Sequence, residues 1–325
     1  MKTNQAKRIF ALLLTAALLF TLFGCGRAPQ EEPSGAPKRL NVVCTLFPQY
    51  DFVQQIAGNK VELTLLLTPG ADSHTYDPSP NDMVKINNCD LFLYTGDLME
   101  LWAADIIKSI DKTKVTVLDL SEGITLSAVE HGEEEEEEEH EAEEHEHSVD
   151  PHIWTSPKNA AIMVQNIAAA LEKLDPANAN AYELDAKSYC DKLDRLDAQI
   201  REVVDSAPIK EIVVCDRFAM HYFCKEYGLK YIAAFDSCTS ETEPSPAMLT
   251  RITEHVKKNH IPAVFYAELS NRNMATKVAS LTGVQTLELH SCHNVTDAQF
   301  NTGVTYLDLM EQNLNMLKLA LGVVK

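Results

Sequence analysis

The sequence has 325 residues, of which 45% are hydrophobic, and its formal net charge is −20. A chain of this length and apolar content can bury sizeable cores. Twelve glutamates and no Lys or Arg stand between residues 130 and 147, which leaves a net charge of only −8 for the rest of the chain. Because the acidity is local and no basic stripe accompanies it, nucleic acid is excluded as a partner.

The first residues, MKTNQAKRIFALLLTAALLFTLFGCG, combine a basic start with a short apolar run, which predicts a secretory signal over residues 1–24. The run is too short to be favoured as a spanning helix. Its end resembles a bacterial lipobox, although Phe23 is bulkier than usual there, and this implies diacylation of Cys25 and an anchor on the extracytoplasmic side of the cell membrane. An ordinary signal peptide and an uncleaved anchor are the competing interpretations. Residues 25–38 are predicted to be a flexible tether.

The first half of the remaining chain alternates strand and helix patterns. In chain order, the predicted elements are a strand beginning near residue 40, a helix ending at Gly58, a strand at 60–67, a helix from about 81, a strand at 90–94, a helix at 99–110 and a strand at 114–121. Alternating strands and helices indicate βαβ units and a largely parallel sheet. We therefore predict an N-terminal lobe over residues 39–155, interrupted by an acidic loop at 130–149.

Two helices follow the acidic loop. Residues 156–176 show helical spacing, with Ser156 as the expected N-cap and Pro157 in the first turn. Residues 177–208 predict a helix of about eight turns, long enough to connect two lobes. This helical region spans residues 156–208.

The strand and helix alternation then resumes. The predicted strands are 211–216, 230–235, 262–270 and 284–292, and the predicted helices are 220–229, 246–259, 274–283 and 304–321. Residues 209–325 are therefore predicted to form a C-terminal lobe. The fold class that we expect is α/β, with two similar βα lobes and mostly parallel sheets.

Imidazole side chains stand in loops where such sheets place ligands. His74 lies in a proline-rich loop after a strand, His152 lies in a proline-stiffened loop before a helix, and His290 ends a strand with His293 following it. Neutral imidazole is the commonest protein ligand of Zn²⁺. Each histidine alone is consistent with a solvated side chain, but three such loops together favour a metal site.

The C-terminal lobe offers further candidates. Asp216 ends a strand and is interpreted either as an oxygen ligand or as a helix cap that pairs with Arg217. His221 lies one helical turn further and serves either packing or a secondary metal role, and His293 is a candidate secondary metal ligand. In the acidic tract HGEEEEEEEHEAEEHEH, His131, His140, His145 and His147 either form a solvated tract or bind metal weakly.

The motifs GADSHTYDPSP, DLFLYTGDLMELW, DPHIWTSPKNA and YFCKEYGL resemble, in order and spacing, the zinc and manganese solute-binding lipoproteins of ABC importers (the cluster A-I proteins). The resemblance covers about residues 39–325. It implies two α/β lobes joined by one long rigid helix, with a metal cleft between them. It implies His74 and His152 as ligands from the first lobe, and His290 and Asp216 from the second.

The sequence departs from the common family pattern in the second lobe. It has Cys215-Asp216-Arg217 where many members have His or Glu, and His290 where many have Asp. Cys238 and Cys292 both fall near the inferred cleft. They are expected to form a disulfide in an oxidising compartment, the alternative being a thiolate ligand.

The resemblance implies a monomer that delivers Zn²⁺ to an ABC permease, and through it to the ATPase, without catalysing a reaction. Three imidazoles and one carboxylate suit Zn²⁺ better than Mn²⁺, which is the alternative cargo. A surface zinc buffer or adhesin and a zinc hydrolase are the competing function classes. The sequence contains no H-E-x-x-H motif and no nucleophile elbow, so the hydrolase is the weaker hypothesis.

Overall fold

The computed structural model describes residues 39–128, 149–235 and 245–324. The predicted signal, the tether with Cys25, and Cys238 lie outside these ranges, as do the tract histidines His131, His140, His145 and His147. Within the described ranges, no helix combines the length and the apolar character that crossing a membrane requires.

The N-terminal lobe is built on a parallel sheet with the strand order β2-β1-β3-β4. Its strands and helices are β1 (Leu40–Cys44), α2 (Phe47–Ala57), β2 (Val61–Leu65), α3 (Pro80–Asn88), β3 (Leu91–Tyr94), α4 (Ala103–Ser109) and β4 (Thr116–Asp119). Short 3₁₀ turns occur at η1 (Gly58–Lys60), η2 (Ser73–Thr75) and η3 (Ile153–Thr155). The central strand β3 is buried along its whole length, as expected for a parallel sheet covered on both faces.

The C-terminal lobe repeats the architecture with a parallel sheet in the order β6-β5-β7-β8. Its elements are β5 (Glu211–Arg217), α7 (His221–Tyr227), β6 (Lys230–Phe235), α8 (Pro246–Lys258), β7 (Ala263–Ala267), α9 (Asn273–Thr282), β8 (Gln285–Leu289), α10 (Asp297–Thr302) and α11 (Tyr306–Ala320). The predicted fold class, two α/β lobes with parallel sheets, is confirmed.

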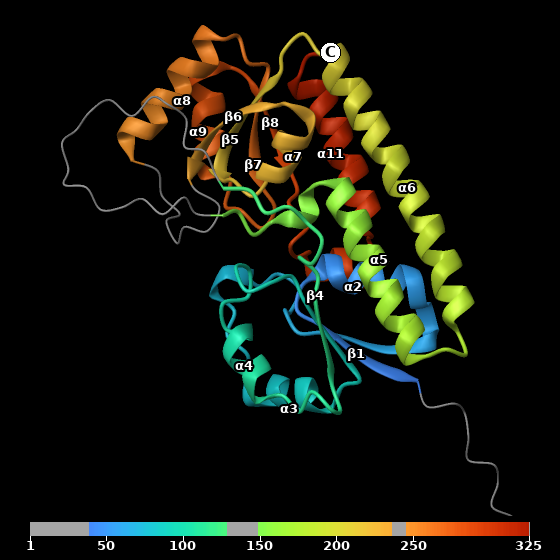
Figure 1. Cartoon of the computed structure of the whole chain (residues 1–325). Helices are drawn as coiled ribbons and strands as arrows, with labels where there is room; N and C mark the ends of the chain where they lie inside the picture. The colour runs from blue at the N-terminus through green and yellow to red at the C-terminus, as the bar shows by residue number, and fades with distance from the viewer. Residues whose placement is uncertain (1–38, 129–148, 236–244, 325) are drawn as a thin grey trace, which may run out of the picture. The chain divides into compact units, whose positions relative to one another are not determined.

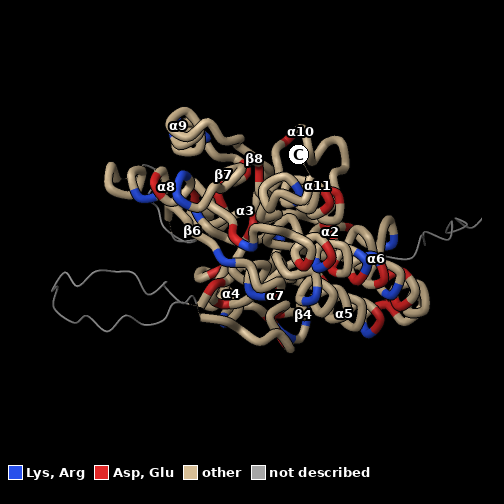
Figure 2. Tube along the Cα trace, turned by 90° about the horizontal axis from the view of Figure 1, so that it is seen from above, with Lys and Arg blue, Asp and Glu red and all other residues tan. Residues whose placement is uncertain are grey.

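The helices between the sheets are α5 (Pro157–Leu174) and α6 (Ala179–Ser206). Ser156 caps α5 by accepting a hydrogen bond from Asn159 N, as the sequence predicts. The 28 residues of α6 form the predicted long helix, which runs along both lobes with α11 beside it (Figure 1). Lys, Arg, Asp and Glu residues are spread along α6 (Figure 2), while Tyr189, Leu193 and Leu196 are buried.

The main hydrophobic core continues from one lobe to the other beneath α5, α6 and α11. Asp51 of α2 is a polar link within it, because its Oδ2 accepts hydrogen bonds from Tyr306 N (2.9 Å) and Tyr189 Oη (3.1 Å). Both lobes accordingly belong to one compact unit, Arg39–Lys325.

Two local features differ from the sequence-based expectation. Helix α4 begins at Ala103 rather than near residue 99, because Glu100 is held in the preceding loop by its own side-chain hydrogen bonds. Helix α10 was not predicted, although Thr296 and Gln299 form a capping box at its start.

Candidate metal centre

A small pocket of about 60 Å³ lies between the two lobes and collects donor groups from separate loops. The N-terminal lobe supplies His74 and His152, and the C-terminal lobe supplies Asp216, Glu268 and His293. A water molecule needs about 10–15 Å³ by a comparable measure, so the pocket has room for an ion of similar size. Of the predicted ligands, His74, His152 and Asp216 are therefore brought together.

His152 is fully buried and oriented by a carboxylate. Asp150 Oδ1 lies 3.0 Å from His152 Nδ1 and also accepts the His152 backbone N–H at 2.7 Å. His152 Nε2 lies 3.3 Å from His74 Nε2. A carboxylate on one ring nitrogen of a histidine, with the other nitrogen directed at a site, is the arrangement that orients metal-binding imidazoles.

His74 lies in the 3₁₀ turn η2, whose N-cap is Asp72. Burial, together with the neighbouring His152 and His293, lowers the pKa of His74 to about 3. Its imidazole is therefore neutral at pH 7. A neutral imidazole has a lone pair for a metal ion, which a protonated imidazole lacks.

His293 repeats the pattern of His152 in the C-terminal lobe. Its Nδ1 lies 2.9 Å from Glu268 Oε1 and 2.7 Å from Ser291 Oγ, so Nε2 is the ring nitrogen that these two contacts do not engage. Burial opposes ionisation of Glu268, but His290, His293 and the hydrogen bonds from Ser291 hold the pKa of this carboxyl well below its usual value. Glu268 is thus an ionised partner of His293, and its oxygens are already engaged.

His290 is not among the residues that line the pocket. Its Nδ1 accepts a hydrogen bond from Cys292 N at 3.0 Å, and Asn313 binds both its backbone N–H and its carbonyl. Its side chain is buried, and burial lowers its pKa. His293, for which the sequence predicts only a secondary role, therefore lines the pocket where His290 was expected to do so.

Asp216 lines the pocket at the end of β5. Its Oδ1 accepts the backbone N–H of Arg217 at 2.9 Å and its Oδ2 lies 3.4 Å from Ala267 N. These contacts come from backbone N–H groups, whereas Glu268 is engaged by the side chains of Ser291 and His293, so Asp216 is the more available oxygen donor of the pocket.

His221 and Cys292 lie away from the pocket lining. His221 Nε2 lies 2.9 Å from Ser127 Oγ, at the base of the acidic loop. Cys292 is a free, fully buried thiol, and its expected partner Cys238 lies outside the described residues, so the predicted disulfide finds no support here.

Within the described ranges, no three His, Cys, Asp or Glu side chains already stand close enough to share a metal ion. The donors form two pairs, His74 with His152 and His293 with Glu268, that face one pocket from opposite lobes. Sequence reasoning missed Asp150 and Glu268. Both were detectable, because Glu268 directly follows a strand and Asp150 precedes His152 by two residues.

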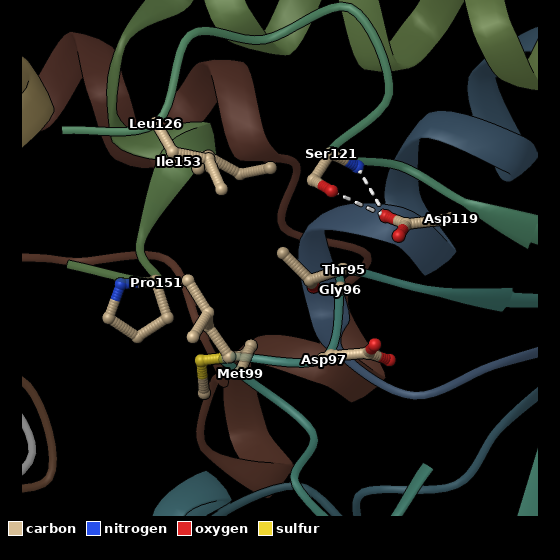
Figure 3. A pocket seen from close by; sticks show the side chains of 10 residues that line it. Thr95, Gly96, Asp97, Met99, Asp119, Ser121, Leu126, Pro151 and Ile153 are labelled. Atoms are coloured by element: carbon tan, nitrogen blue, oxygen red, sulfur yellow. Dashed lines mark hydrogen bonds between the residues drawn. The ribbon is translucent and has the colours of Figure 1, made fainter. Parts of the chain in front are cut away.

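A larger pocket of about 220 Å³ lies within the N-terminal lobe, beyond the ends of β3 and β4 (Figure 3). Its lining includes Gly96, Asp97 and Asp119 but no histidine or cysteine. Asp119 Oδ1 is occupied by hydrogen bonds from Ser121 N and Ser121 Oγ, at 2.8 and 2.7 Å. The chemistry of a metal centre therefore belongs to the smaller pocket between the lobes.

Two α/β lobes, a connecting helix and an interlobe pocket of imidazoles and carboxylates define a class, the two-lobed metal-binding proteins. Residues 42–320 match the family model described as "Zinc-uptake complex component A periplasmic". The chain belongs to this family.

Named relatives agree with this assignment. The chain is 34% identical over 314 residues to the high-affinity zinc uptake system protein ZnuA of Bacillus subtilis, covering 96% of this chain and 97% of that protein. It is also 34% identical to the zinc-binding lipoprotein AdcA of Streptococcus pneumoniae, covering 96% of this chain but only 60% of AdcA. The chain thus spans less than two thirds of AdcA.

Solved structures show the same similarity. The Zn(II)-bound ZnuA-like domain of Streptococcus pneumoniae AdcA has a TM-score of 0.74 and 30% identity, covering 87% of this chain and 99% of that domain. The laminin-binding protein Lmb of Streptococcus agalactiae, described as bifunctional with adhesin and metal-transporting activity, has a TM-score of 0.73 and 28% identity, covering 87% and 99%.

Proposed function

We propose that this chain is the extracytoplasmic binding component of an ABC importer, which takes up Zn²⁺ between its lobes and delivers it to the permease. The observation that carries the proposal is the interlobe pocket, where imidazoles from both lobes face one another and two of them rest on carboxylates. Membership of the zinc-uptake family supports the same cargo and the same partner.

The proposed ligands are His74, His152 and His293, with Asp216 as the oxygen donor. His293 replaces His290 in the set because it lines the pocket, whereas His290 does not, and the Nδ1 of His290 accepts the Cys292 backbone N–H. Asp216 is preferred over Glu268, whose oxygens are engaged by Ser291 and His293. Three imidazoles and one carboxylate are a typical zinc set, and they suit Mn²⁺ less well.

The chain acts, in this proposal, as a monomer that performs no reaction. Metal binding selects a closed arrangement of the lobes, and the permease recognises the loaded form. The lipid at Cys25 holds the protein at the extracytoplasmic membrane surface. Family membership as a transport component supports the absence of catalysis.

Calorimetric titration of the full chain with Zn²⁺ tests the proposal. We expect one tight site, which the double substitution His74→Ala and His152→Ala abolishes. His255→Ala is the matched control, because His255 lies on α8 and contacts Glu211 rather than the pocket. A tight site that survives the double substitution would refute the assignment. Competition with Mn²⁺ is expected to leave the bound Zn²⁺ in place.

A surface adhesin is the second candidate function, because the structural similarity includes Lmb. The two functions predict different growth of cells that lack the gene. Deleting the gene is expected to impair zinc-limited growth, and added zinc is expected to restore it. Normal growth and normal zinc uptake in the deletion strain would favour the adhesin.

A further inference from the structure

The loop that carries His74 is attached to the opposite lobe. Asn294, fully buried, donates hydrogen bonds to the carbonyls of Thr68 (2.9 Å) and Ala71 (2.8 Å). Gly70 N donates to Val295 O at 2.8 Å. The base of the loop is therefore fixed to the same C-terminal segment that presents His293.

The tip of this loop has a second attachment to the C-terminal lobe, at the pocket itself. Arg217 Nη1 lies 2.9 Å from Asp72 Oδ2, and the two side chains are only 29% and 32% exposed. Asp72 Oδ1 accepts the backbone N–H of His74 at 2.9 Å and caps the turn η2. One carboxylate thus connects Arg217 to the backbone of His74.

We propose that Asp72 and Arg217 are a positioning pair, which fixes His74 for the metal from across the pocket. The inference rests on the proposed function, since it requires His74 to be a ligand. A short loop held at its base alone would lose conformational freedom on binding metal. The ion pair already removes part of that freedom in the metal-free protein. Less conformational entropy is therefore lost when the metal binds.

Replacing Arg217 has two opposite effects on zinc affinity, because its guanidinium also lines the pocket. A positive charge there repels a cation, so removing it would strengthen binding and mask the loss of the ion pair. Arg217→Lys separates the two effects, because it leaves the positive charge of the pocket unchanged. It keeps the charge but gives up the planar fork that matches a carboxylate. Asp72→Asn removes the anionic partner while retaining a residue that can cap a helical turn.

The experiment measures the Zn²⁺ dissociation constant of the full chain by competition with a chelating dye. We expect Asp72→Asn and Arg217→Lys each to weaken zinc binding about tenfold. This is the lower end of the roughly 10–100-fold loss of affinity that follows when a residue orienting a metal ligand is replaced. The double variant is expected to lose about tenfold rather than about a hundredfold, because the two substitutions remove one shared interaction. The Zn²⁺ dissociation rate is expected to rise by the same factor.

Matched controls are Asp105→Asn and Arg272→Lys, which alter the exposed pairs Asp105–Lys108 and Arg272–Glu288. Both are expected to bind zinc as the unsubstituted chain does. Metal-free unfolding midpoints are measured for all variants, and if Asp72→Asn fails to fold, Arg217→Lys decides alone. Unchanged affinity, or fully additive losses, would overturn the positioning role. Unchanged affinity in His74→Ala would instead overturn the proposed function.

Discussion

The HSCH segment shows how a single backbone angle separates two histidines. Cys292 has a positive φ of 65°, a conformation that is uncommon for residues other than glycine. On one side of it the backbone of His290, directly after β8, is held by Asn313, and on the other side His293 lines the pocket. The two imidazoles therefore differ in their surroundings although they are three residues apart.

We expect His293→Ala to weaken zinc binding about a hundredfold, whereas His290→Ala leaves the tight site in place. Structural zinc sites with four ligands are worth about 10–16 kcal/mol, or roughly 3 kcal/mol for each ligand. His290→Ala is instead expected to lower the free energy of unfolding by about 1–3 kcal/mol, since Cys292 N loses its buried acceptor. Zinc titration and urea unfolding of both variants measure the two effects, and the reverse ranking would contradict the assignment.

Among single residues, the sequence predicted the positions of the loops better than which of their side chains line the pocket. Strand ends located His74 and Asp216, because loops at the carboxyl ends of parallel strands converge, and the proline-stiffened loop before a helix located His152. It chose His290 because that residue directly follows the strand. A left-handed turn at Cys292 leaves no signature in residue type, so the choice between His290 and His293 depended on the tertiary structure.

Among the elements, the loop after β3 is organised by one buried carboxyl group. Glu100 accepts hydrogen bonds from Thr95 N (3.0 Å), Gly96 N (3.2 Å) and the hydroxyl of Thr45, which follows β1. Gln49 of α2 connects Thr45 to Thr95. Burial raises the pKa of Glu100 to about 7, although these hydrogen bonds oppose the rise.

This raised pKa predicts a pH dependence of stability. The folded state binds the Glu100 proton more tightly than the unfolded chain, whose carboxyl has a pKa near 4.5. The free energy of unfolding therefore carries a contribution that is fully present below about pH 4.5 and lost by about pH 7, with an upper limit of about 3 kcal/mol. Glu100→Gln is expected to remove this contribution.

Urea unfolding of the metal-free protein between pH 5 and pH 8 provides the measurement. The difference between the variant and the unsubstituted chain isolates Glu100, because every other ionisable group is common to both. Glu122→Gln, at an exposed turn, is the control. It is expected to keep the pH dependence of the free energy of unfolding of the unsubstituted chain. If Glu100→Gln leaves the pH dependence of the free energy of unfolding unaltered, another group causes that dependence.

The elements themselves were largely predictable, because strands and helices leave strong periodic patterns. Helix α6 was recognised from the spacing of Tyr189, Leu193 and Leu196, all buried in the structure. The strand alternation predicted both parallel sheets. The late start of α4 was missed because its helical pattern extends back to Glu100, whose tertiary hydrogen bonds override local propensity.

For the whole molecule, the contacts between lobes lie close to the metal pocket. Trp154 Nε1 donates to Ser291 O at 2.7 Å, and Tyr306 Oη donates to Trp154 O at the same distance. Asn294 adds the buried link to the His74 loop. The sequence predicted the two lobes but none of these contacts, because residues more than a hundred positions apart carry no shared local pattern.

The acidic tract is expected to be separable from this assembly. Ala128 and Val149 form an antiparallel bridge at its base, and Ser127 is held by Tyr222 Oη, Lys225 and His221 of α7. These contacts fix both ends of the tract independently of its length. Replacing residues 130–147 by a short glycine-serine linker should therefore keep the fold and the tight site.

We expect the shortened chain to bind one Zn²⁺ with unchanged affinity and to lose the weaker zinc binding that is one of the two interpretations of His131, His140, His145 and His147. Its free energy of unfolding should stay level or rise by about 1 kcal/mol, because a shorter loop costs less entropy to close. Calorimetric titration resolves the tight and weak phases separately. Loss of the tight phase would mean that the tract contributes a ligand to the centre, whereas retention of the weak phase would assign that binding to residues outside the tract.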